Sequence, residues 1–190
     1  MGHAGATQLM STVQVSREEL DRRPVRPIQS TFFNSILVNL EYREAGHPGI
    51  ALPALPWAVM EATGAQSAGL SLMDKEGGVC WRAVSGRWAA SAGQSFLLRD
   101  LPCSAAIDAG ELMLLVKPAS AYPAIAGLSP GVIEGMYAPV VRDGRLAGVL
   151  WALAHDDRLQ FDSQDAFMLA ELAAMTRRLR WDRDSTGDQG

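Results

Sequence analysis

The stretch that most constrains this sequence runs from Ala138 to Phe161 and places an Asp-Gly pair between two apolar segments. Asp143-Gly144 is a strong hairpin signal, because a type I′ turn needs positive φ at both central residues and glycine adopts it without steric cost. Beyond the turn, residues 146–154 are apolar at nearly every position, which is typical of a strand covered on both faces. We therefore expect a hairpin whose second strand lies at the centre of a sheet.

Large and small side chains alternate along this second strand. Successive side chains of a strand point to opposite faces of the sheet. One face then carries Val149, Trp151, Leu153 and His155, and the other carries Leu150, Ala152 and Ala154. We expect closely packed helices against the small set and a pocket against the large set.

The bulk composition excludes several classes of protein. A net charge of −4 and a pI near 5.4 argue against nucleic acid as a main partner, because phosphate binding needs a basic face. No apolar run reaches the roughly 18 residues of a membrane span, and the first ten residues do not resemble a secretory signal. Cys80 and Cys103 form no disulfide framework and no metal-binding pattern, which is typical of a cytoplasmic protein with reduced thiols.

The rest of the chain predicts helices and paired strands in an α+β order. Amphipathic spacing and capping residues predict helices at residues 16–22, 31–44, 52–63, 103–109 and 163–181. Turn signals separate further strands at residues 67–73, 79–85, 94–98 and 112–116. Because neighbouring strands are joined by short turns, we expect an antiparallel sheet with helices on one face.

We predict three regions along the chain. Residues 1–29 are expected to be a mobile lead, residues 30–181 the folded domain and residues 182–190 a disordered tail. The lead contains Arg22, Arg23 and Arg26, which either meet an acidic partner or stay in solvent. A solvated linker is the expected reading of such a charged cluster.

The order of these motifs resembles that of the GAF sensory domain, over residues 52–181. Ser104 departs from the pattern, because GAF domains at the front of bacterial sensor histidine kinases often have glycine at that place. The resemblance rests on residues 65–74, Cys80 to Gly86, Leu101-Pro102-Cys103, Ala138-Pro139-Val140, Asp143-Gly144, Gly148-Val149-Leu150, His155-Asp156-Asp157 and Phe161-Asp162.

The resemblance implies a six-stranded antiparallel sheet with helices on one face and a ligand pocket on the other. Such domains bind small molecules or bilins, or only dimerise. We expect a stand-alone bacterial sensor in the cytoplasm that binds an unidentified small molecule and acts on a separate output protein such as a histidine kinase. We also expect a homodimer through the helices at residues 32–44 and 167–181. The alternative is an adaptor that dimerises without a ligand.

Aromatic side chains are spread over the elements expected to line that pocket, as in many ligand sites. Ordinary core packing explains any single one of them equally well. No cofactor is identified, and His155-Asp156-Asp157 lacks the second histidine of a metal site. The predicted ligand contacts are Trp81, Phe96, Cys103, Ile107, Tyr137, Trp151 and His155, and Trp88 is a further aromatic residue of the pocket face.

Cys103 carries the remaining candidate chemistry. It precedes a short helix, whose N-terminal field lowers a thiol pKa, so a redox switch, a bilin attachment point and a metal ligand are open beside a plain buried side chain. Bilin-binding relatives usually place histidine directly after the cysteine, where this chain has Ser104. A few GAF proteins are methionine sulfoxide reductases, which need cysteines within reach of each other. Cys80 and Cys103 are in unmatched positions, so we predict that the chain is not an enzyme and keep a thiol-dependent redox role as an alternative.

Overall fold

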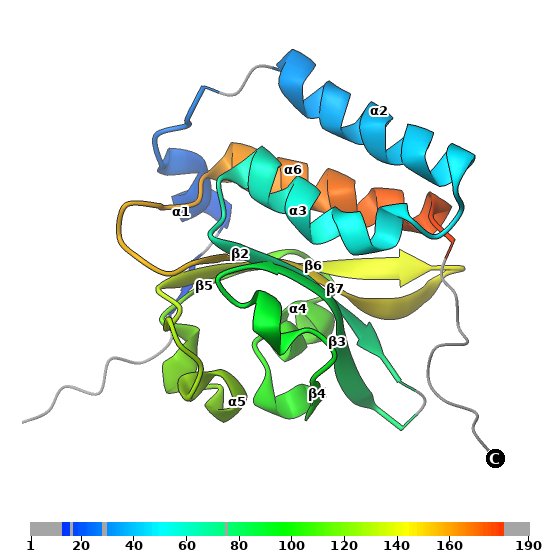
Figure 1. The fold of residues 1–190 in the computed structure, drawn as a ribbon. Helices are drawn as coiled ribbons and strands as arrows, with labels where there is room; N and C mark the ends of the chain where they lie inside the picture. Colours follow the sequence, from blue (N-terminus) through cyan, green and yellow to red (C-terminus); the bar gives the residue numbers. More distant parts are fainter. Residues whose placement is uncertain (1–12, 16, 28–29, 75, 181–190) are drawn as a thin grey trace, which may run out of the picture.

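The computed structural model describes residues 13–15, 17–27, 30–74 and 76–180. Within them, seven strands form one antiparallel sheet in the order β1-β5-β6-β7-β2-β3-β4 (Figure 1). The strands are β1 (Val13–Val15), β2 (Ser67–Met73), β3 (Gly78–Gly86), β4 (Ser95–Leu97), β5 (Met113–Val116), β6 (Glu134–Arg142) and β7 (Arg145–Ala154). β7 occupies the central position, as the unbroken apolar run predicts.

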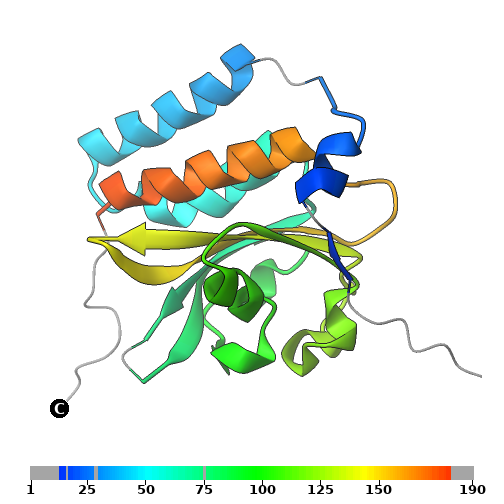
Figure 2. The same ribbon diagram turned by 180° about the vertical axis from the view of Figure 1, so that it is seen from behind.

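Helices cover both faces of the sheet unequally. Two long helices, α3 and α6, lie directly on one face and α2 packs outside them, whereas only short helices lie on the other face (Figures 1 and 2). The helices are α1 (Arg17–Arg22), α2 (Ser30–Gly46), α3 (Ala51–Thr63), α4 (Cys103–Ala109), α5 (Pro123–Ala126) and α6 (Ser163–Met175), with 3₁₀ turns η1 (Ala89–Ser91), η2 (Leu98–Asp100), η3 (Pro118–Ser120) and η4 (Thr176–Arg178).

The turn between β6 and β7 has the predicted geometry. Asp143 has φ 51° and Gly144 has φ 71°, so both central residues lie in the left-handed region that a type I′ turn requires. The alternation along β7 is also confirmed. Leu150, Ala152 and Ala154 belong to the core under the long helices, and the larger side chains belong to a second core on the opposite face.

The segment before the domain is more ordered than predicted. β1 pairs antiparallel with β5, so the sheet has one strand more than the six expected. Arg23 is buried rather than solvated, because its guanidinium donates to both carboxylate oxygens of Glu134 at 2.9 and 3.1 Å and to the carbonyl of Phe161 at 2.6 Å. The mobile, solvated lead is thus corrected for β1 and for Arg23, whereas the helix expected at residues 16–22 is present as α1 and Arg22 is exposed. The first residues of the lead lie outside the described part.

The last helix is shorter than predicted. α6 ends at Met175 and continues as the tight turn η4, where the Thr176 hydroxyl donates to the Ala173 carbonyl at 2.6 Å. η4 and the residues after it are tied to α2, because Arg178 donates to Glu41 at 2.7 Å and the Arg180 backbone N–H donates to Glu44 at 2.6 Å. Trp181 and the tail at 182–190 lie outside the described residues.

Candidate functional site

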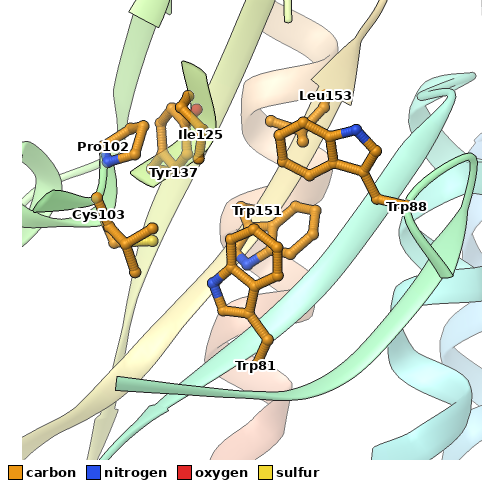
Figure 3. Close-up of a pocket in the computed structure, with 9 residues that line it drawn as sticks. Trp81, Trp88, Pro102, Cys103, Ile125, Tyr137, Trp151 and Leu153 are labelled. Atoms are coloured by element: carbon orange, nitrogen blue, oxygen red, sulfur yellow. The ribbon is translucent and has the colours of Figure 1, made fainter. Parts of the chain in front are cut away.

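The second core, on the face away from the long helices, contains a small hollow. It lies between the strands β3, β6 and β7 and the segments around α4 and α5 (Figure 3). Its free volume is about 10 Å³, which is room for at most one water molecule. The lining residues are Trp81, Trp88, Leu101, Pro102, Cys103, Ile125, Tyr137, Trp151 and Leu153.

Two glycines allow the largest side chains to lie flat on the sheet. β2 and β7 pair Gly69 with Trp151, and a Cβ on Gly69 would stand 2.1 Å from the Trp151 ring. Gly135 precedes Tyr137 on the same face of β6, and a Cβ there would stand 2.4 Å from the Tyr137 hydroxyl oxygen. Both approaches are too close for any other residue, so these glycines set the position of the rings.

Three tryptophans and a phenylalanine form one aromatic cluster at the hollow. The ring of Trp81 stacks on Trp88 at a centroid distance of 5.6 Å and an angle of 16°. It also meets Trp151 at 5.3 Å and Phe96 at 4.6 Å in tilted arrangements. Such geometries are favourable for aromatic pairs, and the three tryptophans of the cluster form one wall of the hollow (Figure 3).

The indole N–H and phenol O–H groups at the hollow differ in whether they have hydrogen-bond partners. Trp88 donates its indole N–H to the Pro130 carbonyl at 2.9 Å, and Trp151 donates to the Ser71 hydroxyl at 2.9 Å. The indole nitrogen of Trp81 and the hydroxyl of Tyr137 are buried and have no hydrogen-bond partner. Burial raises the pKa of Tyr137, so this hydroxyl stays protonated. An unpaired buried donor costs about 1–3 kcal/mol, which makes these two groups candidates for contact with a ligand.

Cys103 is the first residue of α4 and is buried against Ser71, whose hydroxyl lies 3.8 Å from the sulfur. Burial raises the pKa of the thiol to about 12, which outweighs the hydrogen bonds that lower it. The expected lowering by the helix is therefore wrong, because a seven-residue helix without a side-chain cap does not compensate the loss of water around a thiolate.

Cys80 lies away from Cys103. It stands between Val79 and Trp81, which both face the second core, so the alternation of β3 places Cys80 on the opposite face of the sheet. The two sulfurs therefore have the sheet between them, which rules out a direct disulfide in this conformation.

His155 directly follows β7 at the edge of the aromatic cluster, with its ring centroid 5.3 Å from that of Trp88. Its Nε2 is 2.7 Å from the Ser67 hydroxyl and its Nδ1 is 2.9 Å from the Gly131 carbonyl. Because a carbonyl only accepts, Nδ1 carries the proton and the Ser67 hydroxyl donates to Nε2. Burial lowers the pKa of His155, so the ring is neutral near pH 7. Both nitrogens are occupied, and a ligand contact through this residue stays a prediction.

The structure brings four of the seven predicted contacts to the hollow itself: Trp81, Cys103, Tyr137 and Trp151. Phe96 stands behind Trp81, and Ile107 packs against the same core from α4. The sequence placed Leu153 and Trp88 on the pocket face without naming them as ligand contacts, and the structure brings both to the hollow. Ile125 was not predicted, because it lies in the four-residue helix α5, which is too short for a periodic pattern.

Metal sites and membrane-spanning helices are two further features to consider. Within residues 13–15, 17–27, 30–74 and 76–180, no group of three or more histidine, cysteine or acidic side chains is placed to hold a metal ion. Over the same part of the chain, no helix has both the length and the apolar character needed to cross a membrane.

Comparisons with known proteins were made by sequence and by structure. Neither a family model nor a curated protein matches the sequence. Among solved structures, the GAF domain of a phosphoenolpyruvate-protein phosphotransferase from Acinetobacter is 17% identical, with a TM-score of 0.65 over 81% of this chain and 93% of that one. The phycoerythrobilin-bound GAF domain of a cyanobacterial phytochrome is 14% identical, with a TM-score of 0.59 over 79% and 97%.

This chain has the GAF fold. The resemblance found in the motif order is thereby confirmed, as is the α+β antiparallel architecture that it implies. The hollow lies on the face of this GAF domain opposite the long helices, where the resemblance predicts a pocket.

One prediction is corrected by the same comparison. A free methionine-R-sulfoxide reductase from Neisseria meningitidis, solved with its substrate, is 24% identical, with a TM-score of 0.64 over 82% of this chain and 92% of that one. The prediction that the chain is not an enzyme is overturned, because an enzyme has the same fold over almost the whole domain. At this identity the likeness shows the fold alone, so it does not assign the reductase reaction to this chain.

Proposed function

We propose that this chain is a sensory GAF domain that binds a small molecule in the hollow between the sheet and α4. The observation that carries the proposal is the pair of buried groups without partners, the Trp81 indole N–H and the Tyr137 hydroxyl, at one apolar hollow. Buried polar groups are almost always hydrogen-bonded, so two exceptions among the residues that line one hollow support a missing partner. Aromatic hollows with few polar groups are typical ligand sites.

The signalling part of the proposal rests on the family resemblance. A change in the hollow would reach the long helices through the sheet, because β7 contributes Trp151 to the hollow and Leu150 and Ala152 to the core under those helices. The output protein, a histidine kinase or another partner, and the cytoplasmic location are predictions of the same resemblance.

A second candidate is the adaptor that dimerises without a ligand. The filled state of the hollow favours it, since a free volume of about 10 Å³ leaves space for no metabolite unless the wall moves. In that case water satisfies the Trp81 and Tyr137 groups, and the aromatic cluster is simply core.

Native mass spectrometry of protein purified from its own host distinguishes the two candidates. If the chain is a sensor, we expect the purified protein to retain a small molecule. Removal of this molecule should change the fluorescence of the tryptophans around the hollow. A Trp81→Phe variant, which keeps an aromatic side chain but removes the N–H, should retain less of that molecule, whereas Trp57→Phe on the exposed side of α3 should retain as much as the wild type. Protein that carries no molecule after purification and binds none of the host metabolites would support the adaptor.

A further inference from the structure

The lining of the hollow has no charge. Its nine residues are aromatic, aliphatic, one proline and one cysteine. The thiol and the phenol are both neutral, because burial raises the pKa of Cys103 and of Tyr137. The neighbouring His155 is neutral as well, and its two ring nitrogens already have protein partners. An ion in this hollow would lose its water and gain no counter-charge.

The hydrogen-bonding groups at the hollow indicate the chemistry of the missing partner. An indole N–H is only a donor, and it needs an acceptor. Trp88 and Trp151 find protein oxygens for theirs, so the unpaired N–H of Trp81 is an exception within one aromatic cluster (Figure 3). The Tyr137 hydroxyl donates or accepts, so a carbonyl or ether oxygen is compatible with both groups.

We propose that the hollow takes an uncharged, mostly apolar molecule that carries a carbonyl-type hydrogen-bond acceptor for the Trp81 indole N–H. This inference rests on the proposed function, since it names the class of ligand for the same site. It separates the site from pockets for nucleotides, free amino acids or carboxylates, whose charges would be unpaired here.

Entry of such a molecule requires one wall to move. The sheet wall is held by backbone pairing between β6, β7, β2 and β3. The facing wall consists of Ile125 of α5 and of Leu101, Pro102 and Cys103 at the start of α4. α4 has seven residues, begins without a side-chain cap and ends at Gly110 in the left-handed conformation. Short segments with few backbone hydrogen bonds open at lower free energy than central strands, so α4 is the wall that yields.

The test uses four probes that share a methyl-substituted benzene ring: 4-methylacetophenone, 4-methylbenzoate, 4-methylbenzylamine and 4-ethyltoluene. The readout is the indole N–H resonance of Trp81 in ¹⁵N-tryptophan-labelled full-length protein, assigned with Trp81→Phe. The exposed Trp57 serves as an internal reference for non-specific effects. We expect the neutral ketone to shift the Trp81 resonance and to bind about tenfold more tightly than the carboxylate, the ammonium or the hydrocarbon, the last difference being one hydrogen bond.

Followed through the Trp151 indole resonance, the Trp81→Phe variant should bind the ketone about tenfold more weakly and should lose its preference for the ketone over 4-ethyltoluene. The control Trp57→Phe should bind all four probes as the wild type does. Tighter binding of the carboxylate or the ammonium at Trp81 would overturn the neutral-ligand inference and leave the sensor proposal intact. If no probe moves the Trp81 resonance, both the inference and the proposed ligand site fail.

Discussion

The position of the Trp151 ring depends on the absence of a single carbon atom at Gly69. A methyl group there would stand 2.1 Å from the ring, and the backbone of β2 cannot retreat, because it pairs on both sides. Overpacking of this kind typically costs 1–3 kcal/mol, so we expect Gly69→Ala to lower the free energy of unfolding by about 2 kcal/mol. Thermal and urea unfolding measure the loss, and near-ultraviolet circular dichroism should report the displaced indole.

Gly127→Ala is the matched control, since a Cβ at Gly127 meets nothing within 4 Å. Equal stabilities of the two variants would show that the ring of Trp151 is not held by close contact with the sheet.

The two cysteines should differ strongly in reactivity. Cys103 is buried with its pKa raised to about 12, whereas Cys80 is partly exposed. Near pH 8 the native Cys103 thiol has roughly 10³-fold less thiolate than an ordinary thiol, so iodoacetamide should modify Cys80 first and Cys103 only on opening of the fold. Mass spectrometry of the wild type, Cys80→Ser and Cys103→Ser measures the two rates. Modification of native Cys103 at the rate of Cys80 would contradict the burial argument and revive the redox alternative.

At the scale of elements, the connection between α1 and the sheet depends on Arg23. The side chains of Arg23 and Glu134 are 10% and 6% exposed, whereas the neighbouring pair Arg22–Glu18 is 73% and 77% exposed. Removing one partner of a buried pair leaves an uncompensated charge and costs about 3 kcal/mol, whereas an exposed pair contributes at most about 1 kcal/mol. We therefore expect Arg23→Ala to lower the free energy of unfolding by about 3 kcal/mol and Arg22→Ala to change it little.

Urea unfolding of the two variants side by side measures this difference at adjacent positions of the chain. A similar, small effect of both substitutions would mean that the Arg23 contact does not hold β1 and α1 on the domain.

The start of α6 should make the stability of the domain depend on pH. Asp162 caps the helix, and Asp165 accepts the Asp162 N–H at 3.0 Å and contacts Arg26. Burial raises the pKa of Asp165 to about 6, although Arg26 opposes the shift. The folded state then binds a proton more tightly than the unfolded state, so the contribution of this group to stability is lost as pH rises from about 4 to about 6, by on the order of 2–3 kcal/mol.

The side chain at position 165 does not titrate in the variant Asp165→Asn. The free energy of unfolding of this variant should therefore depend less on pH between about 4 and about 6. Urea midpoints of both proteins between pH 4 and pH 7 measure the difference. Parallel pH profiles would show that Asp165 is ionised throughout in the native domain.

At the scale of the whole molecule, the long helices expose apolar side chains on the side that faces away from the sheet. On α2, Phe33, Ile36 and Leu40 face inward, whereas Val38 is 62% exposed and Tyr42 is 80% exposed. We expect a homodimer through this outer layer, with a sedimentation mass twice the monomer mass of 20.4 kDa. The double variant Val38→Glu/Tyr42→Glu should sediment as a monomer, because it would place charges in the interface.

Leu97→Glu on β4 is the control, since Leu97 is also exposed but belongs to an edge strand of the sheet and not to the helical layer. Wild-type protein that sediments only as a monomer at high micromolar concentration would remove the dimer from the proposed function.

Local sequence determined the parts of this protein that depend on local geometry. The Asp143-Gly144 turn, the central place of β7 and the two faces of that strand follow from backbone sterics and from the period of two along a strand. The GAF fold follows from the order of such elements along the chain.

Only the tertiary structure decided which groups lose water and which find partners. From the sequence, Arg23 is expected to be a solvated charge, but in the structure it pairs with Glu134, 111 residues away. Cys103 is likewise expected to be an activated thiol, but the second core buries it and raises its pKa. The unpaired Trp81 N–H likewise appears only once the oxygens around each indole are placed. Desolvation and long-range pairing depend on residues distant in the chain, and no local pattern carries that information.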